Sequence, residues 1–174
     1  MIVMPPAIAE QFKQFLTRRD LPPAARLVDE KWLRLCLDSV CHQIYQNWEL
    51  CIADDCSPKP YIRHILEEYQ AKDSRIKIIF RETNGHISAA SNSALELATG
   101  EFSVLLDHDD ELSEHALYFV AEELNRFPGT QMIYSDEDLI DENGKRSIPK
   151  FKPDFSLDLM YSLNLVTHLS AYRT

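Results

Sequence analysis

Two kinds of hydrophobic pattern alternate along the chain. In one, apolar residues recur at steps of three and four, which places them on one face of a helix; in the other, a short apolar run is bounded by turn residues, as in a buried strand. The helical pattern occupies residues 31–46, 62–69, 87–98 and 113–124, and the strand pattern occupies 48–53, 75–80, 101–106, 131–134 and 165–172. Because strands that alternate with helices pair in parallel through crossovers, we predict an α/β fold, a mostly parallel twisted sheet with helices on both faces.

Two local signals refine this pattern. Ser113 is placed to cap the helix that carries Leu117, Val120 and Leu124, since serine is favoured at the residue before a helix. Further along, the pair Asn143-Gly144 predicts a tight turn.

The first thirty residues fit the alternation poorly. The stretch 7–27 suits a helix, but Pro22 and Pro23 interrupt it. We therefore expect an atypical leader over residues 1–29 and one domain over residues 30–174.

Composition then narrows the classes of function. Of 174 residues, 45% are apolar and 26% charged, which is typical of a globular protein. The net charge of −10 argues against a nucleic-acid partner. The four cysteines form no CxxC pair, so we expect reduced thiols. No apolar run reaches the roughly 18 residues of a membrane-spanning helix, and the expected location is the cytoplasm, with peripheral attachment to the inner face of the membrane as the alternative.

Acidic residues follow two of the expected strands directly. These residues are Asp54, Asp55, Asp107, Asp109 and Asp110. The carboxyl ends of strands in an open parallel sheet line one crevice, so the two acidic turns are expected to converge there. Such a cluster favours a hard divalent cation, Mg²⁺ or Mn²⁺, that completes its shell with the oxygens of a diphosphate. Taken one at a time, each aspartate is better explained as a turn former or helix cap, whereas the pair of clusters favours a ligand site.

The acidic turns also carry a resemblance to a known family. The segment 48–57 (WELCIADDCS) resembles the strand and Asp-Asp-x-Ser turn of family 2 glycosyltransferases, and 105–110 (LLDHDD) resembles their Asp-x-Asp motif. The segments between and after them agree in order: 84–86 (NGH), 89–94 (AASNSA), 98–101 (ATGE) and 134–138 (YSDED). The resemblance runs from about Lys31 to Thr174 and implies the GT-A fold, a Rossmann-like architecture.

The resemblance assigns roles to the acidic residues. Asp54 or Asp55 would accept a hydrogen bond from the donor nucleobase, with Arg81 near the same pocket. Asp107 would contact the ribose or the metal, Asp109 would be the principal metal ligand, and Asp110 would assist it or cap the next helix. The metal, Mn²⁺ or Mg²⁺, would stabilise the departing nucleoside diphosphate.

The implied reaction moves a sugar from a UDP-, dTDP- or GDP-sugar to a glycan or another hydroxyl acceptor, as in polysaccharide biosynthesis. Inverting members also need a carboxylate base, which normally lies beyond the position of Thr174. Within the chain, the tight acidic cluster Asp136, Glu137 and Asp138 offers a base or a solvated loop, and His168 is left unassigned between packing and ligation.

The chain also departs from the family pattern. No Pro-x-Tyr-Asn turn precedes Lys31, and Met1 to Pro5 is either a remnant of the first strand or unrelated sequence. We therefore expect the nucleotide-sugar-binding part of the fold, truncated after it. Two other functions stay open: a catalytically incomplete nucleotide-sugar-binding fragment, and a magnesium-binding phospho-acceptor domain, which would need a late-strand lysine such as Lys150 or Lys152.

Overall fold

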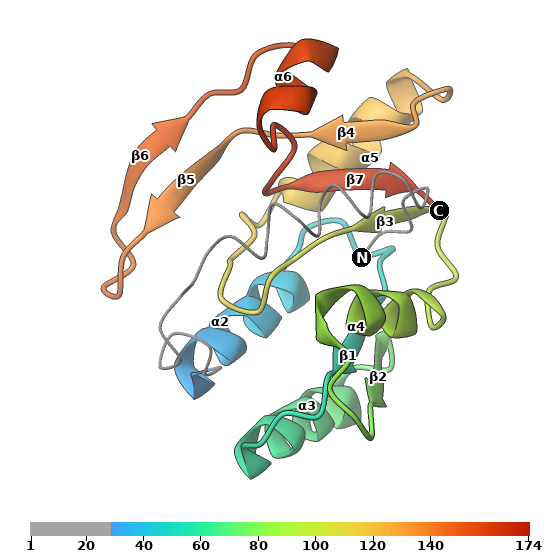
Figure 1. Ribbon diagram of the computed structural model, residues 1–174, viewed down its shortest axis with the longest axis vertical. Coiled ribbons are helices and arrows are strands. Elements are labelled where there is room, and N and C mark those ends of the chain that lie inside the picture. Colours follow the sequence, from blue (N-terminus) through green and yellow to red (C-terminus); the bar gives the residue numbers. More distant parts are fainter. Residues whose placement is uncertain (1–28) are drawn as a thin grey trace.

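The computed structural model describes residues 29–174, so the expected leader lies outside the described residues except for Asp29. Helices and strands are mixed along this part of the chain, as the α/β prediction requires (Figure 1). The helices are α2 (Glu30–Cys41), α3 (Pro60–Lys72), α4 (His86–Leu95), α5 (Ala116–Arg126) and α6 (Leu157–Ser162). The strands are β1 (Leu50–Asp54), β2 (Ile76–Phe80), β3 (Phe102–Val104), β4 (Met132–Tyr134), β5 (Glu137–Ile140), β6 (Arg146–Lys150) and β7 (Ser170–Arg173).

The first half of the described chain builds a compact α/β unit. Strands β1 and β2 pair in parallel, with Leu50 opposite Ile76 and Asp54 opposite Phe80, and α3 is the crossover between them. Helix α2 begins where the Asp29 carboxylate accepts a hydrogen bond from the Lys31 amide at 2.8 Å. Pro60 opens α3, where the missing amide proton costs no helical hydrogen bond.

The core of this unit lies between α2, α3 and β2. The apolar faces expected from the sequence are buried there, and the buried cluster consists of Leu33, Leu37, Ile62, Ile65, Leu66, Tyr69 and Ile76. Ile65 and Leu66 are only 1% and 2% exposed. Burial of such side chains is the dominant favourable term in folding, so this cluster is the main source of stability in the described residues.

The second half pairs differently from the expected parallel pattern. Strand β7 lies between β3 and β4 and is antiparallel to both, so β3 and β4 are parallel to each other but do not pair directly. The turn expected at Asn143-Gly144 joins β5 and β6 in an antiparallel hairpin that projects from the rest of the molecule (Figure 1). The hairpin is antiparallel because the chain reverses directly at its turn. Strand β7 follows the hairpin and α6, and it enters between β3 and β4 in the direction opposite to both.

Helix α5 is capped by a distant residue. The residue before it is His115, whose side chain makes no capping bond, so the expectation that Ser113 caps this helix was wrong. Instead, the Leu117 amide donates to Gln43 Oε1 at 3.0 Å, and Gln43 Nε2 donates to the Ser113 carbonyl at 2.7 Å. Gln43 is fully buried, and its amide satisfies both a donor and an acceptor at the start of α5.

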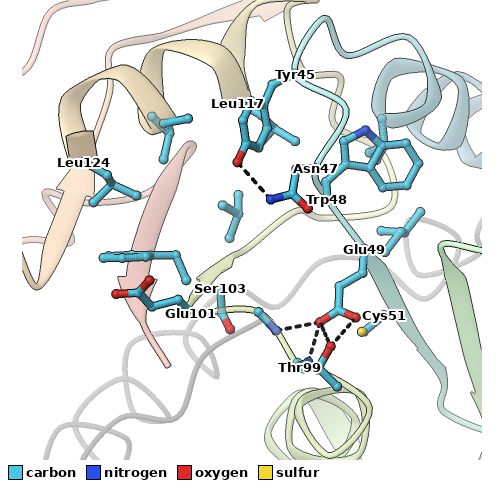
Figure 2. Close-up of a pocket in the computed structure, with 18 of the residues that line it drawn as sticks. Tyr45, Asn47, Trp48, Glu49, Cys51, Thr99, Glu101, Ser103, Leu117 and Leu124 are labelled. Carbon is cyan, nitrogen blue, oxygen red and sulfur yellow. Dashed lines mark hydrogen bonds between the residues drawn. The ribbon is translucent and has the colours of Figure 1, made fainter. Parts of the chain in front are cut away.

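The Glu49 carboxylate joins the β1–β2 unit to the turn that precedes β3. It accepts hydrogen bonds from Lys77 Nζ and, at 2.8 Å, from the Gly100 amide. It also accepts hydrogen bonds from the Thr99 amide (Figure 2). Partial burial alone would raise the pKa of Glu49, but these donors outweigh it and lower the pKa to about 2. The ionised form of Glu49 is therefore part of the folded structure.

The buried cluster can be tested by Ile65→Ala. We expect this change to lower the free energy of unfolding by about 2–5 kcal/mol, because it leaves a cavity in a packed core. Urea denaturation measures the loss. Glu67→Ala on the same helix removes a side chain that is 52% exposed and should cost less than about 0.5 kcal/mol; equal losses would contradict the assigned core.

The Glu49 network predicts a pH dependence of stability. Its folded pKa of about 2 lies below the roughly 4.3 of an unfolded glutamate, so its contribution is complete above pH ~4.3 and is lost as the pH falls towards 2. Urea denaturation at pH 5 and pH 3 should show a smaller pH dependence for Glu49→Gln than for the unsubstituted protein. Glu67→Gln serves as the control and should leave the pH dependence unchanged.

Candidate functional site

An ion pair joins the loop after β1 to the loop between β2 and α4. Arg81 Nε lies 2.7 Å from Asp55 Oδ1, and both side chains are mostly buried. The Gly85 amide donates to both Asp55 oxygens at 3.0 Å, and Asn84 Nδ2 donates to the Asp55 carbonyl at 3.0 Å. Both oxygens of the Asp55 carboxylate thus accept hydrogen bonds from donors within the protein.

Arg81 carries this connection into α4. Its Nη1 donates to the Ala89 carbonyl at 3.2 Å and to Ser93 Oγ. Close approach depends on Gly85, because a Cβ there would lie 2.7 Å from both Arg81 Nη2 and the Ala89 Cβ. The Asn-Gly-His segment therefore fixes the end of β2 against the start of α4.

A cavity of about 310 Å³ opens beside this ion pair, at the carboxyl end of β1. Its polar lining includes Asp54, Ser57, Arg63 and Arg81. Asp54 Oδ2 accepts a weak hydrogen bond from the Ser57 amide at 3.4 Å, and Arg63 stacks 3.7 Å from the centre of the Phe80 ring. One carboxylate with few internal donors and two guanidinium groups can recognise a flat, polar ligand with both donors and acceptors.

A second group of polar side chains lies in the loop after β3. Ligand atoms of Asp107, Asp110 and His168 all lie within 4.8 Å of one another, and His168 Nδ1 is 3.0 Å from Asp110 Oδ2. This hydrogen bond raises the pKa of His168. Asp109, by contrast, is outside this group, with a side chain that is 62% exposed.

Negative charge in this loop is only partly compensated. Loss of solvation raises the pKa of Asp107, and the charge of Asp110 raises it further. The Cys36 thiol donates to the Asp107 carbonyl at 3.4 Å and is affected by the same negative charge. Burial and the charges of Asp110 and Asp109 raise the pKa of Cys36 to about 12. A bound cation would relieve this repulsion.

The donor set fits a divalent metal. Two carboxylates and one imidazole can ligate Mn²⁺ or Mg²⁺ while leaving positions for waters or phosphate oxygens. Asp107, Asp110 and His168 would hold such an ion, and its chemistry would be the stabilisation of developing negative charge on a phosphate leaving group.

The expected site residues thus form two groups. Asp54, Asp55 and Arg81 gather at the ends of β1 and β2, and Asp107 and Asp110 gather after β3. That the two groups act on one ligand stays a prediction. His168 could not be assigned from sequence, because only β7 brings it back to a loop almost sixty positions earlier.

The acidic cluster at 136–138 is engaged in structural contacts. Glu137 pairs with Lys150 at 2.9 Å and with Lys152 at 3.5 Å, and Asp136 Oδ1 accepts from the Lys152 amide at 2.7 Å. Asp138 lies 3.5 Å from Arg146. These contacts stabilise the β5–β6 hairpin and account for both lysines, which removes the lysine that a phospho-acceptor domain would need.

Comparison with known proteins agrees with this architecture. The model of the family described as Glycosyl transferase family 2 matches residues 26–173. The chain belongs to this family. The motif resemblance, the α/β GT-A fold and the interpretation as a part of that fold are thereby confirmed.

Individual relatives agree with this assignment. The chain is 48% identical over 136 residues to the uncharacterized protein y4gI of Sinorhizobium fredii and 39% identical over 144 residues to the O-antigen biosynthesis protein RfbC of Myxococcus xanthus. These alignments cover 78% and 83% of this chain but only 15% and 11% of the relatives. The chain therefore spans a small part of the length of the curated proteins it matches.

Among solved structures, the crystal structure of Staphylococcus aureus TarS 1–349 is similar, with a TM-score of 0.66 and 25% identity over 84% of this chain and 44% of TarS. Structures of the same TarS fragment in complex with UDP and with UDP-GlcNAc are also similar, at 24% identity.

Among residues 29–174, no helix is long and apolar enough to cross a membrane. All four cysteines are free thiols.

The Asp55–Arg81 pair predicts a difference between two aspartates. In metal-free buffer, Asp55→Ala should lower the free energy of unfolding by about 2 kcal/mol, because Arg81 and the Gly85 amide lose a charged acceptor. Asp109→Ala, at an exposed carboxylate, should change it by less than about 0.5 kcal/mol. Urea denaturation of both variants makes the comparison, and similar losses would show that Asp55 has no positioning role.

Proposed function

We propose that the chain forms the donor-binding part of a glycosyltransferase that uses a nucleoside-diphosphate sugar, with UDP as the preferred nucleotide, in a metal-dependent and inverting reaction. The acceptor is a hydroxyl group of a glycan in polysaccharide biosynthesis. The observation that carries the proposal is that ligand atoms of Asp107, Asp110 and His168 lie within 4.8 Å of one another in a member of glycosyl transferase family 2.

The two groups of side chains bind different parts of the donor, one the nucleobase and the other the diphosphate. The nucleobase lies in the cavity at the end of β1, where Asp54 accepts a hydrogen bond from a base nitrogen and Arg63 and Arg81 line the pocket. Asp55 acts as a positioning residue, because its carboxylate already binds Arg81 and Gly85. The preference for UDP is supported by the TarS complexes with UDP and UDP-GlcNAc.

The loop after β3 holds the diphosphate through a cation, Mn²⁺ or Mg²⁺. Asp107 and Asp110 would supply carboxylate oxygens to this ion and His168 would supply a ring nitrogen, while Asp109, the other aspartate of the Asp-x-Asp motif, has an exposed side chain outside this group. Transfer breaks the bond between the sugar and the diphosphate as the acceptor oxygen attacks the anomeric carbon, and the acceptor proton passes to a carboxylate base outside the described residues.

A catalytically incomplete binding fragment is the second candidate. It is favoured by the engagement of Asp136, Glu137 and Asp138 in ion pairs and hydrogen bonds, since none of these carboxylates is then available as the base. The two candidates share the donor site and differ in turnover: hydrolysis of UDP-GlcNAc by the purified chain would count against the incomplete fragment.

Calorimetric titration with UDP, dTDP and GDP tests the donor site. With Mn²⁺ present, we expect UDP to bind, and binding should weaken at least tenfold when EDTA replaces Mn²⁺. Asp107→Asn and His168→Ala should each weaken Mn²⁺-dependent binding by about tenfold or more, because each removes a ligand. Asp158→Asn, an exposed aspartate on α6, is the control. Failure of all three nucleotides to bind in Mn²⁺ would refute the proposal.

A further inference from the structure

Lys152, which follows β6, has a buried ammonium group. Its side chain is only 9% exposed, although lysine is seldom buried unless it is paired. The ammonium donates to the Thr167 carbonyl and, at 2.9 Å, to the His168 carbonyl, and the Glu137 carboxylate lies 3.5 Å away. A lysine has three donors, so two main-chain carbonyls and one carboxylate can account for all of them. The ammonium thus bridges the β5–β6 hairpin and the segment that leads into β7.

The main chain around Lys152 is tied to the same segment. The Lys152 amide donates to Asp136 Oδ1 at 2.7 Å. Next to Asp136, the Ser135 amide donates to the Leu169 carbonyl at 3.0 Å, and the Leu169 amide donates to Ser135 Oγ at 3.3 Å. Together with the contacts of the ammonium, these hydrogen bonds hold the main chain at three successive residues, 167–169.

The position of His168 depends on such contacts. Its φ is 43°, in the left-handed region that residues with a β-carbon seldom adopt and that surrounding contacts must maintain. Its side chain is 47% exposed, so packing around the imidazole does not fix it alone. The main-chain contacts therefore set the place from which His168 Nδ1 reaches Asp110 Oδ2 at 3.0 Å.

We propose that Lys152 is a positioning residue for the metal site and acts through His168. By holding the carbonyls of residues 167 and 168, it keeps the imidazole facing the acidic loop. The segment 134–138, which contributes to the family resemblance and offered a candidate base, then has a different part in the site: Glu137 and Asp136 hold Lys152 in place. This inference rests on the proposed function, because it takes His168 as a metal ligand.

The charge of Lys152 and its contacts predict opposite effects on metal affinity. A nearby lysine repels a metal ion, so removal of its charge alone would strengthen Mn²⁺ binding, whereas loss of its carbonyl contacts would weaken it. Lys150 is the matched control. It pairs with Glu137 at 2.9 Å and its side chain is 57% exposed, but the donors that reach residues 167 and 168 belong to Lys152. Lys150→Met and Lys152→Met therefore remove the same charge and differ in these contacts.

Titration of the full 174-residue chain with Mn²⁺ alone tests the proposal, with free Mn²⁺ measured by electron paramagnetic resonance. Lys152→Met should weaken binding by about tenfold, as expected for loss of a group that orients a metal ligand, whereas Lys150→Met should not weaken it. In a His168→Ala background, Lys152→Met should change the affinity by less than about twofold, because both residues act on one contact. Unchanged affinity in Lys152→Met, or an undiminished loss without His168, would overturn the proposal.

Hydrogen exchange without metal separates the other outcomes. Lys152→Met should speed exchange of the Ser135 and Leu169 amides, while the amides of β2 keep their rates and show that the fold is intact. If β2 also exchanges faster, Lys152→Gln, which keeps an amide donor, replaces Lys152→Met in the titration. Faster exchange at Leu169 with unchanged Mn²⁺ affinity would leave Lys152 a structural role only and overturn this inference alone. Failure of the unsubstituted chain to bind Mn²⁺ would instead refute the proposed function, and this inference with it.

Discussion

The buried amide of Gln43 holds the two halves of the described chain together. Its oxygen caps α5 and its nitrogen binds the Ser113 carbonyl, while the preceding helix contributes Ser39, whose hydroxyl accepts from the Leu112 amide at 3.1 Å. Since Gln43 also packs at the end of α2, the loop that carries Asp107 to Asp110 is fixed to the same helix that closes the β1–β2 core. An unsatisfied amide at this depth would cost about 1–3 kcal/mol per lost partner, so the loop has little freedom to move away.

This anchoring explains why two acidic turns of similar composition differ in chemistry. The carboxylate of Asp55 pairs with the guanidinium of Arg81 and accepts a hydrogen bond from the Gly85 amide, so partners within the protein compensate its negative charge. In the loop after β3, the basic groups beside the carboxylates are imidazoles, His168 at 3.0 Å from Asp110 and His108 at 3.9 Å from Asp109, and the pKa of Asp107 rises through lost solvation and the charge of Asp110. The charge of the first turn is therefore compensated within the protein, whereas the second turn keeps negative charge that favours a bound cation.

Sequence patterns predicted what depends on neighbouring residues. The three- and four-residue spacing located α2, α3, α4 and α5, and the apolar runs located β1 to β4, because helix faces and buried strands are local in sequence. Three features were missed or left open because they are formed at long range: Gln43 caps a helix more than seventy positions away, β7 inserts antiparallel between β3 and β4, and His168 meets Asp110 only through that strand. The donor and metal roles of the aspartates came from the family motifs and stay predictions.

The unequal burial of the helices suggests how the site depends on the rest of the fold. Helices α2 and α3 enclose a continuous core, but α5 and α6 bury no residue, and Phe119, Phe127 and Tyr161 are at least half exposed. The acidic loop connects β3 to α5. In this second half the buried apolar residues lie on β7 and just before it rather than on α5: Leu165, Val166, Leu169 and Ala171. The geometry of the loop is set from one side by Gln43 and Cys36. On the other side it depends on what packs against α5, so affinity for a ligand at Asp107 and Asp110 should be sensitive to changes far from either residue.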